Sequence, residues 1–320
     1  MQKGLSRYLP FLAILLFLAA GPLFLGTAMI SLLTKILIFA LLAMGLDIAF
    51  GYTGLWSFGH AALFGVAAYT NGIFIKHLLI KSFWLAAPAG IVMAILTSAV
   101  FGLIALRASG IYFLLITFAL GQLVYSVAIK WVRMTGGSDG LGGIPYPDLG
   151  FSLSPIGFYY VTLIVVCVCA FILYQIVESP FGYGLRGIRE NETRMRVLGY
   201  NTWLHKYLAF IISGLFGGVA GILYVHFNGV ITPGSVGMAA SGLATIIIII
   251  GGSGTLWGAL IGSGVIFILE YFISMWTPER WPAILGACFV VSVMFARGGI
   301  LPRLTSLWRA WNPYGRRAKS

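Results

Sequence analysis

The densest cluster of charge in this sequence lies in residues 179–201, SPFGYGLRGIRENETRMRVLGYN, between two long apolar stretches. Only 9% of the 320 residues are charged and 60% are apolar, so this segment differs sharply from its surroundings. Side chains of mixed sign suit a protein–protein contact, because they fix its register. The segment is therefore the first candidate for a functional site. Its charged residues are Arg186, Arg189, Glu190, Glu192, Arg194 and Arg196.

The same segment has an amphipathic pattern that predicts one helix over about 185–198. Its apolar side would carry Leu185, Ile188, Met195 and Leu198. Pro180 is expected to end the preceding span, and Gly199 is suited to end the helix itself. Three glycines are expected to make the entry to the helix flexible: Gly182, Gly184 and Gly187.

Two partners are compatible with such a helix. An amphipathic segment can lie among lipid headgroups, where arginine is common. Anionic lipid would repel Glu190 and Glu192, however, which are interleaved with the arginines. We therefore favour docking onto a protein.

Two acidic residues, Asp47 and Glu270, fall within or at the ends of long apolar stretches. An ionisable side chain in a membrane is costly and normally faces the interior of the bundle, so both are candidates for a solute pathway. For Asp47 we favour the alternative that it caps a break at GYTG, residues 51–54. For Glu270, a functional role and a position near the membrane interface are equally open.

The motifs of an enzyme are missing from this sequence. The glycine-rich GGSGTLWG at 251–258 has no lysine, so it is not a nucleotide phosphate loop. The four histidines are scattered without metal-ligand spacing. The three cysteines, Cys167, Cys169 and Cys288, all lie in apolar stretches and predict neither a disulfide nor a zinc site. We expect no catalysis, no cofactor and no metal.

Composition predicts an all-α polytopic membrane protein. The mean hydropathy is +0.98, and backbone in lipid must pair internally, which favours a helical bundle. We expect about ten spans in a single transmembrane domain over residues 1–320. They are placed at 8–27, 30–50, 58–75, 83–106, 111–130, 156–177, 205–227, 241–255, 258–276 and 281–297. The first is expected to be a retained helix rather than a cleaved signal peptide, and the eighth to be broken or re-entrant.

Charge predicts the orientation. With the N-terminus inside, fourteen of the 20 Lys and Arg residues lie on the cytoplasmic side. Many of these residues lie on a loop at 179–204 and on a basic tail at 298–320, so both termini are expected in the cytoplasm. The net charge of +12 then reflects basic loops and anionic lipid headgroups rather than nucleic acid. The long outer connection, about 131–155, is either ordered against a partner or vestibule, or a mobile linker.

Small residues recur at helical spacing in two places and predict close helix packing. The first stripe contains Gly214, Gly217, Gly218 and Gly221, and the second contains Gly258 and Gly262. Their contacts are expected within the chain or against a second membrane subunit. The segments beginning at Gly54 and Gly254 share Leu-Trp among small residues, an echo that is compatible with an inverted repeat.

Three segments carry a family resemblance that covers nearly the whole chain. GLRGIRENETRMRVLGYNTWLHKYLAF, residues 184–210, resembles the coupling loop of permease subunits of branched-chain amino-acid ABC importers. GLDIAFGYTGLWSFGHAALFGVAAYT, residues 45–70, is similar to that family's Gly-x-x-Gly-x-x-Ser-x-Gly-His segment. GGSGTLWGALIG, residues 251–262, is the third match.

The resemblance implies a fold like that of type II ABC importers, in the bacterial inner membrane. It also implies a sister permease subunit as heterodimer partner, two cytoplasmic ATPases and a periplasmic substrate-binding protein. The residues implied to couple to the ATPase are Arg186, Gly187, Ile188, Arg189, Glu190, Asn191 and Glu192. Arg189, Glu190 and Glu192 would act as polar contacts, and Ile188 and Met195 as apolar anchors.

The residues expected to line or gate the solute pathway are Asp47, Gly51, Gly54, Ser57, Gly59, His60, Gly252 and Gly254. We favour a structural hydrogen-bonding role for His60 over contact with solute. Gly187 stands where alanine is usual in the family, which is expected to loosen the loop. Near the expected pathway, Asp47 and Trp56 stand where asparagine and a smaller aliphatic residue are common. Import of branched-chain amino acids is therefore weighed against import of urea or short amides. A secondary transporter and a non-transporting scaffold subunit are further alternatives.

Overall fold

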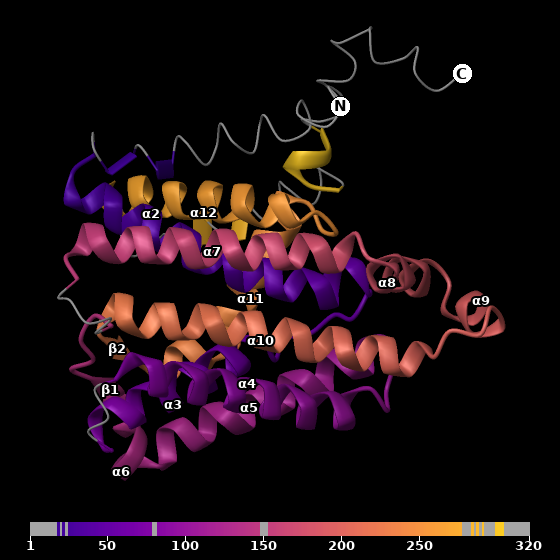
Figure 1. Ribbon diagram of the computed structural model, residues 1–320, viewed down its shortest axis with the longest axis horizontal. Coiled ribbons are helices and arrows are strands. Elements are labelled where there is room, and N and C mark those ends of the chain that lie inside the picture. Colours follow the sequence, from indigo (N-terminus) through magenta and orange to yellow (C-terminus); the bar gives the residue numbers. More distant parts are fainter. Residues whose placement is uncertain are drawn as a thin grey trace, which may run out of the picture.

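The computed structural model describes residues 18–19, 21–22, 25–78, 82–147, 153–276, 283–284, 286–287, 290 and 298–303. Over these residues the chain is mainly helical, as expected. In Figure 1 the long helices lie side by side along the longest axis. Helices α8 (Pro180–Glu190) and α9 (Glu192–Val197) lie at one end, called here the α8–α9 end. Strands β1 (Leu141–Gly142) and β2 (Val230–Ile231) lie at the other, the β-strand end.

Six of the described helices are long and apolar enough to cross a membrane. They are α2 (Thr27–Asp47) with its π-helical continuation (Ile48–Tyr52), α4 (Phe83–Ala105), α5 (Ile111–Lys130), α7 (Pro155–Val177), α10 (Thr202–Asn228) and α12 (Leu256–Trp276). Two shorter helices are α3 (His60–Lys76) and α11 (Met238–Gly251). These eight match the second to ninth expected spans. The expected spans 8–27 and 281–297, with the tail beyond 303, lie largely outside the described residues, so ten spans and cytoplasmic termini stay predictions.

Helix α2 is the centre of the core. Every residue from 36 to 47 is buried, because this helix is apolar on all sides and has neighbours all round. Figure 1 shows α10 between α2, α7 and α12 on one side and α3, α4 and α5 on the other. The Phe39 ring of α2 packs against the rings of Phe64, Tyr224 and Phe267, at centroid distances of 6.3, 5.8 and 4.8 Å.

The expected interruption of the eighth span is present. Helix α11 has 14 residues, about 21 Å at 1.5 Å per residue, which is less than the roughly 30 Å of a bilayer core. It ends in a turn in which Gly252 and Gly254 have φ of +120° and +79°. Such angles suit glycine, since a Cβ would be strained there. Helix α12 then starts at Leu256, and a complete crossing by α11 stays a prediction.

The prediction of a single helix over 185–198 is wrong, because helical geometry is interrupted at Asn191, between α8 and α9. Asn191 is extended, with φ −158° and ψ 98°, and its Oδ1 accepts a hydrogen bond from the Arg194 backbone N at 2.9 Å. This side-chain cap competes with continuation of the helix. Pro180 begins α8, behind the N-cap Ser179, a position that suits proline.

The glycines that were expected to give a flexible entry lie inside α8 and make room for neighbours. A Cβ on Gly182 would lie 2.2 Å from the carbonyl oxygen of Val177, and one on Gly187 would lie 2.6 Å from Met195 Sδ. These glycines therefore allow close packing and do not form a flexible entry to the helix.

The connection between α5 and α7 is ordered against the end of helix α10 and the strand that follows it. Strand β1 pairs antiparallel with β2, with Leu141 opposite Ile231. The backbone N of Ile144 donates to the Gly229 carbonyl at 3.1 Å, and His226 Nδ1 lies 2.7 Å from the carbonyl oxygen of Pro145. The mobile-linker alternative is thus wrong for residues 132–147, while 148–152 lie outside the described residues.

The glycine stripes pack within the chain. A Cβ on Gly214 would lie 2.4 Å from Ser98 Cβ of α4, and one on Gly218 would lie 2.6 Å from Ala94 Cβ. In the second stripe, a Cβ on Gly262 would lie 2.1 Å from the Ile247 carbonyl oxygen of α11, and one on Gly258 would meet Thr255 Oγ1 at 2.4 Å. These helices approach as closely as their backbones allow.

Gly221→Ala should destabilise the protein by about 1–3 kcal/mol through overpacking, because the new Cβ would lie 2.0 Å from the Phe64 carbonyl oxygen of α3. Gly217→Ala is the matched control on the same helix, since its Cβ would lie 3.7 Å from Leu42 Cδ1, an ordinary contact. Thermal unfolding of the purified variants in detergent measures the difference. Equal melting temperatures for the two variants would contradict the packing described for this stripe.

Candidate functional site

Two interruptions of the membrane helices meet at the α8–α9 end. The first, residues 53–59, separates the π-helical turn from α3, and the second, residues 252–255, separates α11 from α12. Asp47 joins them, because its Oδ1 accepts a hydrogen bond from the Gly254 backbone N at 2.9 Å. A Cβ on Gly51 would lie 2.3 Å from that same nitrogen. Asp47 therefore binds the second interruption rather than capping the GYTG break that follows it.

The first interruption satisfies its backbone through side chains and local bonds. The Leu55 backbone N donates to the Ala49 carbonyl at 2.8 Å, and the Phe58 backbone N donates to Thr117 Oγ1 of α5 at 3.3 Å. The Gly59 backbone N donates to Ser57 Oγ at 3.2 Å. Such bonds satisfy backbone groups that the helices leave unpaired.

His60, the first residue of α3, ties this interruption to two other helices. It is fully buried, with Nδ1 3.0 Å from Ser57 Oγ and Nε2 2.5 Å from Ser213 Oγ of α10. The next backbone N, of Ala61, donates to Ser241 Oγ of α11 at 3.1 Å. Both ring nitrogens have partners in the protein, which fits the structural role favoured for this histidine.

Arg189 reaches from the last turn of α8 to the same two interruptions. Its Nη1 donates a hydrogen bond to the carbonyl oxygen of Gly51. Its side chain runs past Gly54 and Gly254, where an added Cβ would lie 3.3 Å from Arg189 Cγ and 3.0 Å from Nη1 respectively. Arg189 was expected to contact a partner, yet its guanidinium contacts the membrane domain of its own chain.

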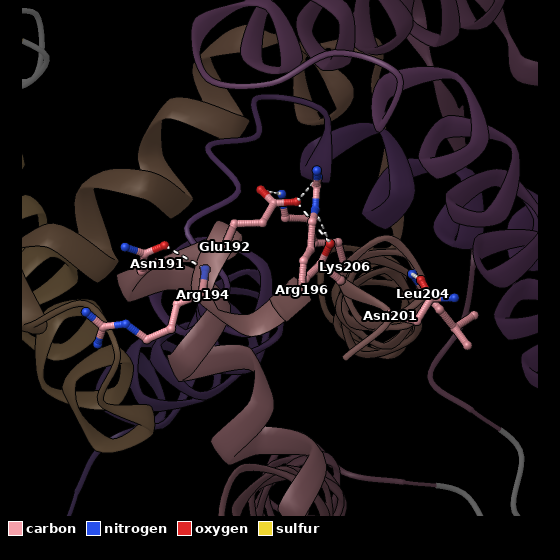
Figure 2. Close-up of polar contacts among 8 residues, drawn as sticks. Asn191, Glu192, Arg194, Arg196, Asn201, Leu204 and Lys206 are labelled. Atoms are coloured by element: carbon pink, nitrogen blue, oxygen red, sulfur yellow. Dashed lines mark hydrogen bonds and ion pairs between the residues drawn. The ribbon is translucent and has the colours of Figure 1, made fainter. Parts of the chain in front are cut away.

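Glu192 holds α9 against the start of α10, as Figure 2 shows. Its carboxylate accepts hydrogen bonds from Arg196 at 2.6 Å, from Thr202 Oγ1 at 3.1 Å and from Lys206. Burial by itself would raise the pKa of Glu192, but the hydrogen bonds from Lys206 and Arg196 outweigh it, so this pKa lies below its ordinary value. The carboxylate therefore stays ionised and bonded within the chain.

The predicted apolar side of this loop is divided between buried and exposed residues. Leu185 and Ile188 are buried. Val197 and Leu198 are 84% and 66% exposed although both are apolar. We call Glu190, Arg194, Val197 and Leu198, which are all exposed, the α9 surface.

A cavity of about 830 Å³ lies among α2, α3, α10, α11 and the turn that precedes α11. Its lining is mainly apolar: Phe39, Leu42, Phe58, Phe64, Met238, Ala239, Ala240, Leu243 and Ile246. Polar groups come from Tyr224, Thr232 and Ser235, and the Tyr224 hydroxyl lies 3.3 Å from Ser235 Oγ. Its volume is in the range of small-molecule sites, and so is the pattern of an apolar wall with a few polar groups.

Comparison with known proteins assigns the family. Residues 28–294 match the family model described as branched-chain amino acid transport system / permease component. The chain belongs to this permease family. LivM of Escherichia coli (strain K12), a high-affinity branched-chain amino acid transport system permease protein, is 27% identical over 91% of this chain and 74% of its own length.

More distant relatives extend this comparison. LivH of the same organism and the same named system is 27% identical, over 83% of this chain and 91% of its own length. The guanosine ABC transporter permease protein NupQ of Bacillus subtilis (strain 168) is 31% identical over 27% of this chain and 26% of its own length. No solved structure matches the chain. The chain is thus a multi-pass integral membrane permease component rather than an enzyme.

In the permease, the eight expected pathway residues form two neighbouring groups. Asp47, Gly51, Gly54 and Gly254 surround the meeting point of the interruptions, and Gly252 begins the second of them, next to Gly298 and Pro302. Ser57, Gly59 and His60 belong to the hydrogen-bond network at the start of α3. None of the eight lines the cavity, although Phe58, which lies among them, does.

The cavity residues themselves were missed. Phe39, Phe64 and Tyr224 are aromatic residues within long apolar stretches, and no local pattern separates a cavity wall from a packed core. The one usable signal was the TPGS segment at 232–235, a hydroxyl-rich turn between two spans.

Glu270 pairs with Lys35, and this ion pair joins α12 to α2 with an Nζ–Oε2 distance of 2.8 Å. Lys35 Nζ also lies 4.6 Å from the centre of the Phe267 ring. Glu270 therefore links two helices and is not among the residues that line the cavity.

Within the described part of the chain, no group of three or more His, Cys, Asp and Glu side chains could hold a metal ion.

Glu192→Gln should loosen α9, because the variant loses its ion pairs with Arg196 and Lys206. We expect amide hydrogen exchange in residues 192–199 to become about fivefold faster at neutral pH, equivalent to about 1 kcal/mol. Hydrogen-exchange mass spectrometry measures this. Glu190→Gln is the matched control, since that carboxylate is exposed on the neighbouring turn; equal acceleration in both variants would contradict the role given to Glu192.

The same network should weaken in acid. Since the folded-state pKa of Glu192 is lowered, its contribution to stability is complete above the ordinary glutamate value and is lost as the pH falls through the lower folded-state value. Amide exchange in residues 192–199, divided by the intrinsic exchange rate at each pH, should therefore become faster in acid in the wild type. In Glu192→Gln, this corrected exchange should already be fast at neutral pH and should change less with pH.

Proposed function

We propose that this chain is the membrane-spanning permease subunit of an ATP-driven importer for branched-chain amino acids. The single observation that carries the choice of solute is the cavity of about 830 Å³ with its apolar wall and few hydroxyls. A branched aliphatic side chain gains free energy by leaving water for Phe39, Leu42 and Phe64. The hydroxyls of Tyr224, Thr232 and Ser235 offer hydrogen bonds to the polar part of the solute.

The alternative solutes, urea and short amides, fit this cavity less well. Their polar surface needs a hydrogen bond for each donor and acceptor that leaves water. The wall of the cavity supplies only a few hydroxyls among mainly apolar side chains.

The partners and the orientation belong to the same proposal. LivM and LivH carry the names of permease proteins of one transport system, which supports a sister permease as partner here. Two ATPases would bind at the cytoplasmic α8–α9 end, through the coupling loop 179–204. A periplasmic binding protein would deliver solute at the β-strand end, where Thr232 and Ser235 border the cavity. The whole of residues 1–320 would form one domain in the bacterial inner membrane.

Within the coupling loop, we assign contact with the ATPase to the α9 surface. Ile188 is buried, and Arg189 and Glu192 already bond to groups of their own chain. Val197 and Leu198 form an exposed apolar pair. The exposed charges of Arg194 in α9 and of Glu190 at the end of α8 would fix register.

Reconstitution of the complete complex in proteoliposomes tests the function. Leucine uptake should require ATP and the binding protein, should persist when an uncoupler removes ion gradients, and should not be inhibited by urea. Uptake that follows an ion gradient without ATP would support a secondary transporter instead, and preferred uptake of urea would overturn the assigned solute.

Ala239→Trp fills the cavity and should lower leucine uptake at least about tenfold. Ala119→Trp, on the exposed face of α5, is the control and should not lower uptake.

Val197→Asp should weaken ATPase binding, because a charge in a buried apolar contact is costly. We expect about tenfold less ATPase to co-purify with the permease in mild detergent, about 1.4 kcal/mol. Ser109→Asp, on the loop between α4 and α5, is the control for added charge. Undiminished co-purification of Val197→Asp would move the docking surface away from α9.

A further inference from the structure

Arg189 occupies a position that docking onto a partner does not explain. It lies in the last turn of α8, directly before the break at Asn191 that leads to α9. Arg189 is exposed, but its guanidinium reaches the end of α2's π-helical turn and donates to the Gly51 carbonyl oxygen. Carbonyls at a helix end lack partners within the helix, so Arg189 supplies a bond that this end needs.

The route of the side chain is open because two glycines border it. Gly54 has φ of +78°, and a Cβ there would lie 3.3 Å from Arg189 Cγ. Gly254 has φ of +79°, and its added Cβ would lie 3.0 Å from Arg189 Nη1. These two glycines belong to the two different interruptions, so a single side chain contacts both.

Asp47 supplies the opposite charge. The carboxylate is fully buried, and while Oδ1 accepts from the Gly254 backbone N, Oδ2 has no hydrogen-bond partner within the described part of the chain. Arg189 Nη1 borders the same Gly254 whose backbone N bonds to Asp47. A buried acid is sensitive to the loss of a neighbouring cation, so the position of Arg189 affects the turn that Asp47 holds.

We propose that Arg189 is a positioning residue that latches the coupling helix α8 to both membrane interruptions, and that its release opens the α8–α9 end of the permease. This rests on the proposed function, since an ATPase would supply the displacement of α9. Because α9 joins α8 one residue after Glu190, a pull on α9 acts first on the turn that carries Arg189. Loss of its bond frees Gly51 and the 252–255 turn to separate.

Cysteine accessibility in the full-length permease tests the latch without any ATPase. The reporter is Ser253→Cys, a half-buried position in the second interruption, with Cys167, Cys169 and Cys288 replaced by alanine. In Arg189→Gln, labelling by a water-soluble maleimide should become about tenfold faster, the change expected from losing one hydrogen bond to a charged group. Arg107→Gln is the matched control, since Arg107 is exposed on the loop between α4 and α5.

Two further variants keep the test decisive if Arg189→Gln folds poorly. Arg189→Lys retains the charge with a single donor group and should give an intermediate labelling rate. Asp47→Asn removes the buried charge, so in combination with Arg189→Gln it should restore slow labelling in part. Additive effects of the two substitutions, or labelling as slow as in the Arg107 control, would overturn the latch.

The complete complex separates this proposal from the docking proposal. Arg189→Gln should retain its ATPase subunits while leucine transported per ATP hydrolysed falls at least about fivefold. If the variant instead loses the ATPase and labelling is unchanged, Arg189 is a docking residue and the latch is wrong. If the wild-type complex shows no ATP-driven uptake, the proposed function fails, and the labelling of the permease alone still decides the latch.

Discussion

Backbone amide and carbonyl groups at membrane depth must find partners inside the protein, since lipid offers none. This constraint governs the two places where the chain leaves helical geometry within the bundle, residues 53–59 and 252–255. Several of the polar side chains in the apolar interior serve these two places. Asp47 binds the second interruption, and Ser57, His60 and Thr117 serve the first.

Close packing of the helices is the second consequence of an apolar, lipid-embedded bundle. Helices in lipid gain little from burying apolar side chains against each other, so they depend on intimate backbone contact. The α10 glycines allow this contact with α3 and α4, where an added Cβ at Gly221 would meet the Phe64 carbonyl oxygen at 2.0 Å. At the α8–α9 end, Gly51 and Gly54 serve polar contacts instead, by leaving space for the Asp47 carboxylate and the Arg189 side chain.

The loop between α7 and α10 divides its charges between two tasks. Arg189 and Glu192 bind the permease itself, through Gly51 and through Arg196 and Lys206. Helix α9, which carries the exposed Val197, lies at the far end of the bundle in Figure 1. A loop with this division can be displaced by a partner at its tip and pass the displacement to the membrane helices at its base.

The sequence by itself determined the class of protein, the positions of eight helices and the charged loop, because these depend on composition and on periodicity along the chain. It also indicated the interrupted eighth span, since β-branched residues and then glycines are adjacent in sequence. It did not reveal that Asn191 divides the loop helix, because a side-chain cap competes with continuation of the helix by a small margin.

Only the tertiary structure decided that Arg189 turns inward, that Asp47 bonds to a turn more than two hundred residues away, and which aromatic residues line the cavity. Periodicity tells which residues share a face of one helix, but the neighbour that covers this face depends on how all the helices pack together.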